Sequence, residues 1–237
     1  MRGSNVNRAK NSLQNNQLDC QTNPSIQLRH FRDREVSQAA NEPQSPGAAT
    51  GFASLDALLK DHGWPRGATT ELLVGQANSN ELSLLLPILA QLTQKGEMVI
   101  LIKPPLTPCA TELTQYGVQL EHLLLVHPRD KRDCLWAIEQ SLQSGGCSAV
   151  LSWQGNQSMS YRELQRLQQS AEESGCLHFL FRPQSESANP SPASLRVQLK
   201  SDGQLALKLL KQLGGARGQN LYLARRARLV LRDQPLH

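Results

Sequence analysis

The sequence lacks any long apolar run. A membrane-spanning helix needs about 18–20 consecutive apolar residues, and the longest such stretch, residues 82–89, is interrupted by Ser83 and Pro87. The polar start of the chain, MRGSNVNRAK, also lacks the apolar segment of a secretory signal. These absences predict a cytoplasmic protein with no membrane partner.

Cysteine is scarce and is not arranged for metal binding. The five cysteines are scattered, with no C-x-x-C pair and no histidine cluster at metal-ligand spacing. An odd number of dispersed cysteines argues against a disulfide framework. We therefore expect reduced thiols and neither a metal nor another cofactor. The cysteines are Cys20, Cys109, Cys134, Cys147 and Cys176.

Aromatic and apolar residues are also few, and they are unevenly distributed. Hydrophobic residues make up 39% of the chain and aromatic residues 4%. Residues 1–47 are rich in Asn, Gln, Ser and Pro, which predicts a disordered N-terminal arm and linker. Residues 48–215 have the apolar periodicity of a folded domain, and residues 216–237 form a basic C-terminal tail. The sequence thus divides into three parts.

The folded part alternates between apolar strands and amphipathic helices. Short buried strands are predicted in ATTELLV, EMVILIKPP, HLLLVHP, CSAVLSW and CLHFLFRP, and a helical pattern follows each of the first four. Such alternation is typical of βαβ units and a mostly parallel sheet covered by helices on both faces. After Pro183 the pattern changes. Two alternating runs flank Asp202-Gly203, which predicts a C-terminal antiparallel hairpin.

The strand ATTELLV leads into a loop that resembles a phosphate-binding loop but lacks its working residues. A functional loop reads G-x-x-x-x-G-K-[ST], in which Lys reaches the phosphates and the hydroxyl binds magnesium. Laid on Gly75, that pattern places Asn80 at the second Gly, Glu81 at the Lys and Leu82 at the hydroxyl. An anion at the Lys position repels a triphosphate. We therefore expect a P-loop-type sheet with a degenerate nucleotide site, and no enzyme.

The segment that precedes this loop, TGFASLDALLKDHGWPRGATTELLVG, resembles the first part of the RecA-type ATPase core. In that core a T-G-x-x-x-L-D-x-x-L helix leads through a Gly-Pro-Gly turn into the strand of the phosphate loop. Two families share this frame with an emptied loop: ImuA, an accessory protein of bacterial translesion synthesis, and SulA, the division inhibitor of the SOS response. The resemblance implies a RecA-like α/β fold.

Several tracts resemble ImuA, among them GWPRGATTELL, RDCLWAIEQSLQSGGCSAVLSW, SPASLRVQL and LKLLKQLGG. SulA shares LLLPILAQL, the strand that ends at Trp153 and the F-x-x-RP around Arg182. On this resemblance the chain is identified as a member of the ImuA family, within the SulA/ImuA superfamily. That membership implies a non-enzymatic adaptor in SOS-induced error-prone translesion synthesis. The partners would be RecA, an ImuB-like Y-family protein and an error-prone replicative-type polymerase, and direct contact with DNA is left open.

The alternative is a SulA-like inhibitor of cell division that binds FtsZ. For either function the candidate contact residues are Trp153, which ends a strand, Arg182 and a cluster of C-terminal arginines. Core packing and partner contact are equally compatible with Trp153. Core packing is compatible with Trp64 and is the favoured expectation for Trp136 on its helix. The arginines of the basic tail are Arg225, Arg226, Arg228 and Arg232.

Overall fold

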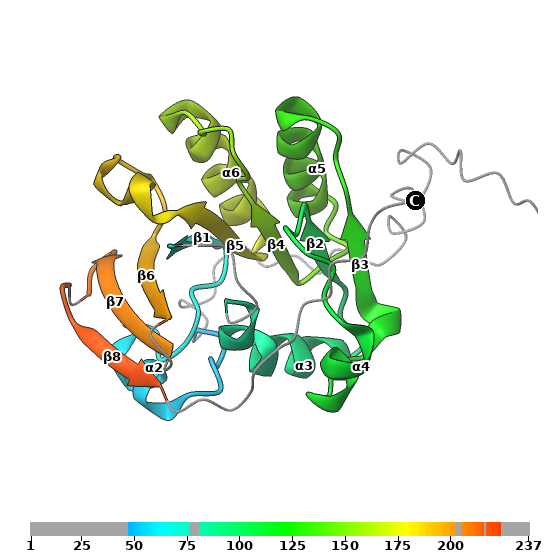
Figure 1. Ribbon diagram of the computed structural model, residues 1–237, viewed down its shortest axis with the longest axis horizontal. Coiled ribbons are helices and arrows are strands. Elements are labelled where there is room, and N and C mark those ends of the chain that lie inside the picture. The colour runs from blue at the N-terminus through cyan, green and yellow to red at the C-terminus, as the bar shows by residue number, and fades with distance from the viewer. Residues whose placement is uncertain (1–46, 76–80, 202–204, 216, 224–237) are drawn as a thin grey trace, which may run out of the picture.

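An eight-stranded mixed sheet runs through the molecule between two layers of helices (Figure 1). The computed structural model describes residues 47–75, 81–201, 205–215 and 217–223. The predicted N-terminal arm lies outside these ranges, apart from Gly47. The strands, in chain order, are β1 (Ala68–Val74), β2 (Val99–Ile102), β3 (Leu123–Val126), β4 (Ala149–Trp153), β5 (Leu177–Pro183), β6 (Leu195–Ser201), β7 (Leu205–Gln212) and β8 (Asn220–Leu223).

The parallel part of the sheet confirms the predicted alternation. The strand order is β3-β2-β4-β5-β1-β6-β7-β8, and every neighbouring pair from β3 to β6 is parallel. Strand β1 lies between β5 and β6, and all of its residues are buried. A strand covered on both faces needs the near-continuous apolar and β-branched sequence seen in ATTELLV.

The antiparallel end of the sheet has one strand more than the sequence indicated. Strands β6 and β7 pair antiparallel as expected, although the turn at residues 202–204 lies outside the described residues. Strand β8 then pairs antiparallel with β7, beyond Gly215, where the sequence placed the end of the folded domain. In this short strand Leu223 is buried and Tyr222 is exposed. Only two residues of the strand, both leucines, face inward, and two positions are too few to indicate a strand from the sequence.

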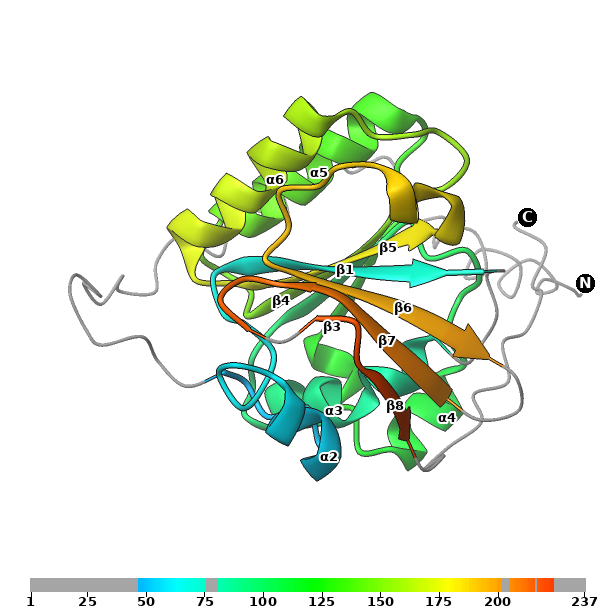
Figure 2. The ribbon, with the colours of Figure 1, turned by 90° about the vertical axis from the view of Figure 1, so that its left-hand side faces the viewer.

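Helices cover both faces of the sheet, as predicted. Figure 2 shows α5 and α6 packed on one face, with α2, α3 and α4 on the other. Within the described ranges, none of these helices combines the length and apolarity needed to cross a membrane. The α-helices are α2 (Ala53–Leu58), α3 (Leu86–Gln94), α4 (Ala110–Gln115), α5 (Lys131–Gln143) and α6 (Tyr161–Ser174), and short 3-10 turns are η2 (Leu82–Leu84), η3 (Leu120–His122) and η4 (Gln184–Ala188).

Local signals fix the starts of α3 and α6. Helix α3 begins at Leu86, so that Pro87 occupies its first turn, where a backbone N–H has no partner within the helix. Helix α6 begins with a complete capping box. The Ser160 hydroxyl accepts from the Glu163 N–H, and the Glu163 carboxylate accepts from the Ser160 N–H.

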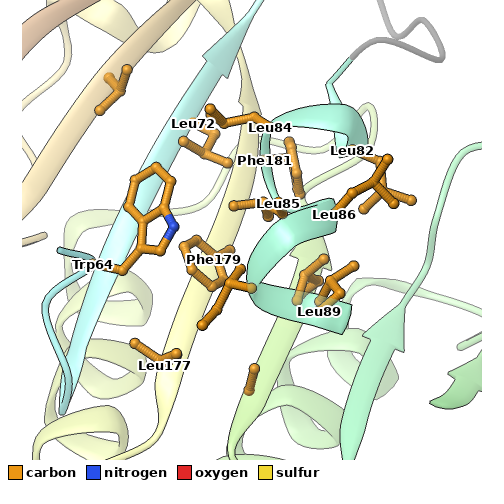
Figure 3. Close-up of a cluster of buried hydrophobic side chains, with 14 of the residues drawn as sticks. Trp64, Leu72, Leu82, Leu84, Leu85, Leu86, Leu89, Leu177, Phe179 and Phe181 are labelled. Atoms are coloured by element: carbon orange, nitrogen blue, oxygen red, sulfur yellow. The ribbon is translucent and has the colours of Figure 1, made fainter. Parts of the chain in front are cut away.

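The larger part of the core lies between the sheet and α3 (Figure 3). Trp64 is fully buried there, and its ring meets Phe179 of β5 edge to face, with 5.3 Å between centroids and 87° between planes. Edge-to-face packing adds to the free energy of burying both rings. Leu82, at the hydroxyl position of the phosphate-loop pattern, is a member of this cluster (Figure 3). The structure therefore places Trp64 in the core, which the sequence allowed without requiring it.

Trp136 does not lie in the core, so that prediction is wrong. Its side chain on α5 is 43% exposed. Helix α5 packs through Cys134, Ile138 and Leu142. At 100° per residue, a position two after Cys134 points about 200° away from that face. Helical periodicity therefore places Trp136 on the outer surface of α5, despite its size and apolar character.

Candidate functional site

The carboxyl ends of the parallel strands border a cleft of about 700 Å³. Open α/β sheets commonly place their functional groups at this edge. The cleft is lined by Val74 and Gly75 at the end of β1, by Glu81 before η2, by residues 103–105 after β2, by residues 129–131 before α5, by Trp153 and residues 155–157 at the end of β4, and by residues 181–183 of β5. It therefore joins residues from six separate parts of the chain.

An aromatic pair forms the floor of the cleft. Trp153 at the end of β4 stacks on Phe181 of β5, with 4.5 Å between ring centroids and 6° between planes. Trp153 is 8% exposed, so most of its surface is used in packing. One edge of the ring still lines the cleft. The structure thus gives Trp153 a packing role and a place in the cleft wall, the two roles that the sequence left open.

Lys103 holds an unusual backbone conformation at the rim of the cleft. Its φ of 58° lies in the left-handed region, which costs a non-glycine residue about 1–2 kcal/mol. The side chain lies over Gly155, where an added Cβ would come within 3.1 Å of Lys103 Nζ. Such strain is found most often at functional sites. Glycine at 155 leaves room for the Lys103 ammonium across the cleft mouth.

Positive charge dominates the rim. Lys103 and Lys131 are half-buried, whereas Arg129 is exposed. Lys131 forms an ion pair with Glu163 at 2.8 Å. The carboxylate of Asp130 accepts a hydrogen bond from the Asp133 N–H, because it caps α5. The cleft is also lined by two acids, the exposed Asp130 and the buried Glu81. Three basic side chains against one exposed acid leave the rim with a positive excess beside the aromatic pair, which suits an acidic surface of a partner protein.

Beneath the cleft, Arg182 belongs to a buried ionic cluster. It is 1% exposed. Its Nη1 donates to Glu71 Oε1 at 3.0 Å and its Nη2 to Glu186 Oε2 at 2.9 Å. Its Nε donates to Gln154 Oε1 at 2.7 Å. All three guanidinium nitrogens are thus used within the protein. Arg182 shapes the cleft from below and does not offer a partner a free cation, contrary to its selection as a contact residue.

The second arginine of the cluster, Arg196, completes the pairing of Glu71. Glu71 is fully buried, and its Oε2 accepts from Arg196 Nε at 2.7 Å. Arg196 Nη2 also donates to the Glu186 carbonyl at 3.0 Å. Two carboxylates and two guanidiniums therefore balance in a region closed to solvent, the arrangement that buried charges require.

Glu186 ties the cluster to the loop after β5. Burial raises the pKa of its carboxyl, but this effect is outweighed and the pKa is lowered. The lowering comes from hydrogen bonds donated by Asn189, Gln154 and Ser158, and from the Arg182 charge. The ionised carboxylate thereby holds η4 against the end of β4. No local pattern indicates this role, because two of the three hydrogen-bonding partners, Gln154 and Ser158, lie 32 and 28 residues away.

A second buried polar group, His178, lies on the same face of the sheet, below α6. Its Nε2 is 2.9 Å from Ser152 Oγ and its Nδ1 is 2.9 Å from Thr69 Oγ1. Burial lowers its pKa to about 3, so the ring is neutral at physiological pH. Neither ring nitrogen faces a carboxylate, and Ser152 is fully buried. The pair therefore serves packing and is not a nucleophile with its base.

The low pKa of His178 implies that the stability of the fold depends on pH. Because the unfolded chain has the ordinary His pKa of about 6.5, it binds the proton between pH 6.5 and 3 while the folded state does not. Stability must then fall as pH decreases through this window. Between pH 7.5 and pH 5, His178 is expected to lower the free energy of unfolding by about 2 kcal/mol. Urea unfolding of the wild type and His178→Gln across this range measures the effect, and equal pH slopes for the two would contradict it.

The residues of the phosphate-loop pattern are only partly described. Gly75 is exposed at the end of β1, whereas Glu81 and Leu82 are both buried. Asn80 lies outside the described residues, as do Arg225, Arg226, Arg228 and Arg232 of the basic tail. No group of three or more His, Cys, Asp or Glu side chains in the described part of the chain is arranged to hold a metal ion.

The comparisons with known proteins favour one of the two families. The family model described as "Cell division inhibitor SulA" matches residues 67–177. The chain is 28% identical to cell division inhibitor SulA of Photorhabdus laumondii over 116 residues, 49% of this chain and 64% of that protein. It is 25% identical to the SulA of Serratia marcescens, over 53% of this chain and 74% of that protein. It is also 25% identical to the SulA of Serratia proteamaculans, over 58% of this chain and 81% of that protein.

These matches overturn the expectation of a translesion-synthesis adaptor. The matched relatives are named as division inhibitors, and nothing in the comparisons supports RecA, an ImuB-like protein or a polymerase as partner. The assignment to ImuA depended on the segment from Gly51 and on the SPASLR tract, most of which lies outside residues 67–177. Inside the match, LLLPILAQL and the strand ending at Trp153 were already common to both families. The chain is thus similar to SulA proteins, and its finer placement within the superfamily is not shown.

Proposed function

We propose that this protein inhibits cell division by binding FtsZ, as part of the response to DNA damage. The observation that carries the proposal is the match of residues 67–177 to the SulA model, together with three relatives of that name. The chain matches 64% of the length of the first of these relatives, so function is transferred here only as a proposal. An inhibitor of FtsZ would act in the cytoplasm and would need no catalytic group.

We assign the cleft at the carboxyl edge as the surface that contacts FtsZ. Its lining falls within or close to the matched residues, since it runs from Val74 to Pro183. Its aromatic floor and basic rim have the composition of protein-binding surfaces, where buried aromatic anchors and Arg are enriched. The arginines of residues 225–232 are proposed as a second, salt-dependent contact with an acidic surface.

The proposed function also accounts for the emptied phosphate loop. We propose that the sheet is a RecA-like frame whose nucleotide site has degenerated and whose cleft now binds a protein. Two observations support this view. Leu82 is committed to the core, and Glu81, at the position of the phosphate-binding Lys, is a buried acid. A buried acid beside a triphosphate would repel it.

The proposal predicts a division phenotype. Induced expression in a rod-shaped bacterium is expected to produce long filaments with segregated nucleoids and no FtsZ rings, because the inhibitor removes FtsZ from the polymer pool. Cell length and FtsZ localisation are read by fluorescence microscopy. With purified proteins, a molar excess of the inhibitor should remove most of the FtsZ that sediments in the presence of GTP.

Two controls make the result specific. Immunoblots must show equal protein levels in filamenting and control cells, and the carrier protein of any fusion must leave cell length unchanged. Cells of normal length at a high protein level, combined with unchanged FtsZ sedimentation, would refute the proposed function.

A further inference from the structure

Two cysteine sulfurs lie in contact at the amino edge of the sheet, opposite the cleft. Cys147 precedes β4 and Cys176 precedes β5, and their Sγ atoms are 3.9 Å apart. Both are free thiols, the first half-buried and the second buried. We propose that Cys147 and Cys176 form a redox-active dithiol site, which a peroxide oxidises to an intramolecular disulfide.

The backbone around the two thiols fits a disulfide. The Leu177 N–H donates to the Ser148 carbonyl at 3.0 Å, so the two cysteines flank a hydrogen bond between adjacent parallel strands. Because Ala149 pairs with Leu177, Cys147 and Cys176 are offset by one residue along the two strands. A strand spacing of about 4.8 Å and a rise of about 3.3 Å per residue put their Cα atoms about 5.8 Å apart, within the separation of about 4.4–6.8 Å that disulfides span. The sulfurs must approach from 3.9 Å to about 2.05 Å, which rotations of the two side chains can supply.

Glycine turns give this edge freedom to adjust. Cys147 follows the Gly-Gly turn that ends α5, and Gly145 has a φ of 64° with no atom near its Cβ position. Cys176 directly follows Gly175, whose φ is 69° and whose Cβ position is equally open. Neither turn is therefore packed against another atom on the Cβ side of its glycine.

The environments of the two thiols assign their roles. Cys147 is the more accessible, so a peroxide reaches its sulfur first. Cys176 has a pKa raised well above the ordinary value by its hydrogen bond with Cys147 and by burial, while the Arg66 charge acts in the opposite direction. A thiol that stays protonated is a poor first nucleophile but can resolve an adjacent sulfenic acid. A pocket of about 410 Å³ beside Gly175 and Arg66 gives solvent access to this edge.

The oxidation balances in two steps. The Cys147 thiolate attacks one peroxide oxygen, the O–O bond breaks, and one water leaves after protonation, so that Cys147 becomes a sulfenic acid. The Cys176 sulfur then attacks the sulfenic sulfur, the S–O bond breaks, and the thiol proton of Cys176 leaves with the hydroxyl as a second water. The peroxide is reduced and the two thiols are oxidised by two electrons. An added dithiol reverses the reaction by exchange.

The test uses the full chain and hydrogen peroxide. Oxidised and reduced samples are alkylated under denaturing conditions and analysed by mass spectrometry. Fragment-ion spectra must separate Cys147 from Cys134, because no Lys or Arg lies between them. The expected result is two alkyl labels fewer than in the reduced sample, a cross-link between Cys147 and Cys176 that is about 2 Da lighter than the two unlabelled thiol segments together, free thiols at Cys20, Cys109 and Cys134, and full reversal by dithiothreitol. Closing the loop between residues 147 and 176 should also raise Tm by roughly 5–10 °C.

Single variants distinguish the dithiol site from a mere core contact. Cys176→Ser should leave a sulfenic acid at Cys147 that dimedone captures, whereas Cys147→Ser should leave Cys176 unreacted at the same peroxide concentration. Cys134→Ala is the matched control and should still form the cross-link. Over-oxidation of Cys147 in the wild type with Cys176 still free, or no reaction of either thiol, would overturn the proposal.

Discussion

Replacement of Glu71 by Ala is expected to lower the free energy of unfolding by about 3–5 kcal/mol. The change removes the carboxylate that pairs with Arg182 at 3.0 Å and with Arg196 at 2.7 Å. Both guanidiniums remain buried, with only Glu186 to balance them. Urea unfolding followed by circular dichroism at neutral pH measures the loss, which is among the largest that a single substitution produces.

The size of this effect follows from the unpaired charges left behind. A buried ion pair adds little more to the stability of the fold than a pair of apolar side chains, because the cost of desolvation offsets the attraction between the two charges. Removing one member leaves the other desolvated and unpaired, which is far more costly. Exposed pairs behave differently, since water replaces the lost partner. Arg166→Gln, which breaks the pair between the exposed Arg166 and the half-buried Glu139, should therefore cost much less than Glu71→Ala, about 1 kcal/mol.

A double variant tests the assignment of the loss to charge imbalance. Glu71→Met with Arg196→Met removes one charge of each sign and leaves the Arg182–Glu186 pair, at 2.9 Å, in place. The double variant should be more stable than the sum of the two single losses predicts, by at least about 1 kcal/mol. A loss below about 1 kcal/mol for Glu71→Ala would show that water reaches the cluster and that its charges are not buried.

The fold could be predicted from the sequence because its signals are local. Strand β1 is an uninterrupted buried run, and α6 carries its capping box at Ser160 and Glu163. Strand β8 escaped recognition because it has four residues and only two of them face inward. Trp136 was misplaced because size and apolar character were given more weight than its helical position. Prediction of the fold therefore failed in two cases: where an element was too short to show a pattern, and where the type of a residue was given more weight than its position in the helix.

The candidate site could be predicted only in part, because its contacts are long-range. The charged Glu71 within an apolar strand was visible in the sequence, but its partners are 111 and 125 residues away. Nothing in the sequence around Lys103 indicates a positive φ, and the approach of its side chain to Gly155 joins residues 52 positions apart. Trp153 was identified correctly as a strand-end residue, yet its stacking on Phe181 required the strand order.

The ionic cluster and the cleft are mechanically linked through Arg182 and Gln154. Arg182 lines the cleft, and its Nε donates to Gln154, the residue after Trp153. The cluster therefore holds the end of β4, and with it the Trp153 ring, in position relative to the basic residues of the cleft rim. Glu71 variants would disturb the cleft as well as stability, so they are unsuited to testing the binding surface. Variants for that purpose must change the rim alone.

Reversal of charge at two rim positions is the second large effect that we expect. Lys103→Glu with Arg129→Glu should weaken FtsZ binding about 100-fold, equivalent to about 2.7 kcal/mol, and abolish filamentation. Like charges placed opposite one another in an interface cost several kcal/mol and slow association. Arg129 is exposed and Lys103 is half-buried, and neither forms an ion pair within the described residues, so the fold should survive the change.

A matched reversal at the other edge of the sheet separates a local contact from a change in net charge. Lys95→Glu with Arg66→Glu removes one lysine and one arginine that are exposed at the amino edge. The two double variants carry the same net charge, so any general effect of charge on encounter with FtsZ is equal in both. Binding is measured at low and high salt, and the wild type should lose affinity as salt screens the rim. Equal inhibition of FtsZ by the two double variants would exclude the cleft as the docking surface. Loss of inhibition only in the cleft variant, with an unchanged Tm, places the contact at Lys103 and Arg129.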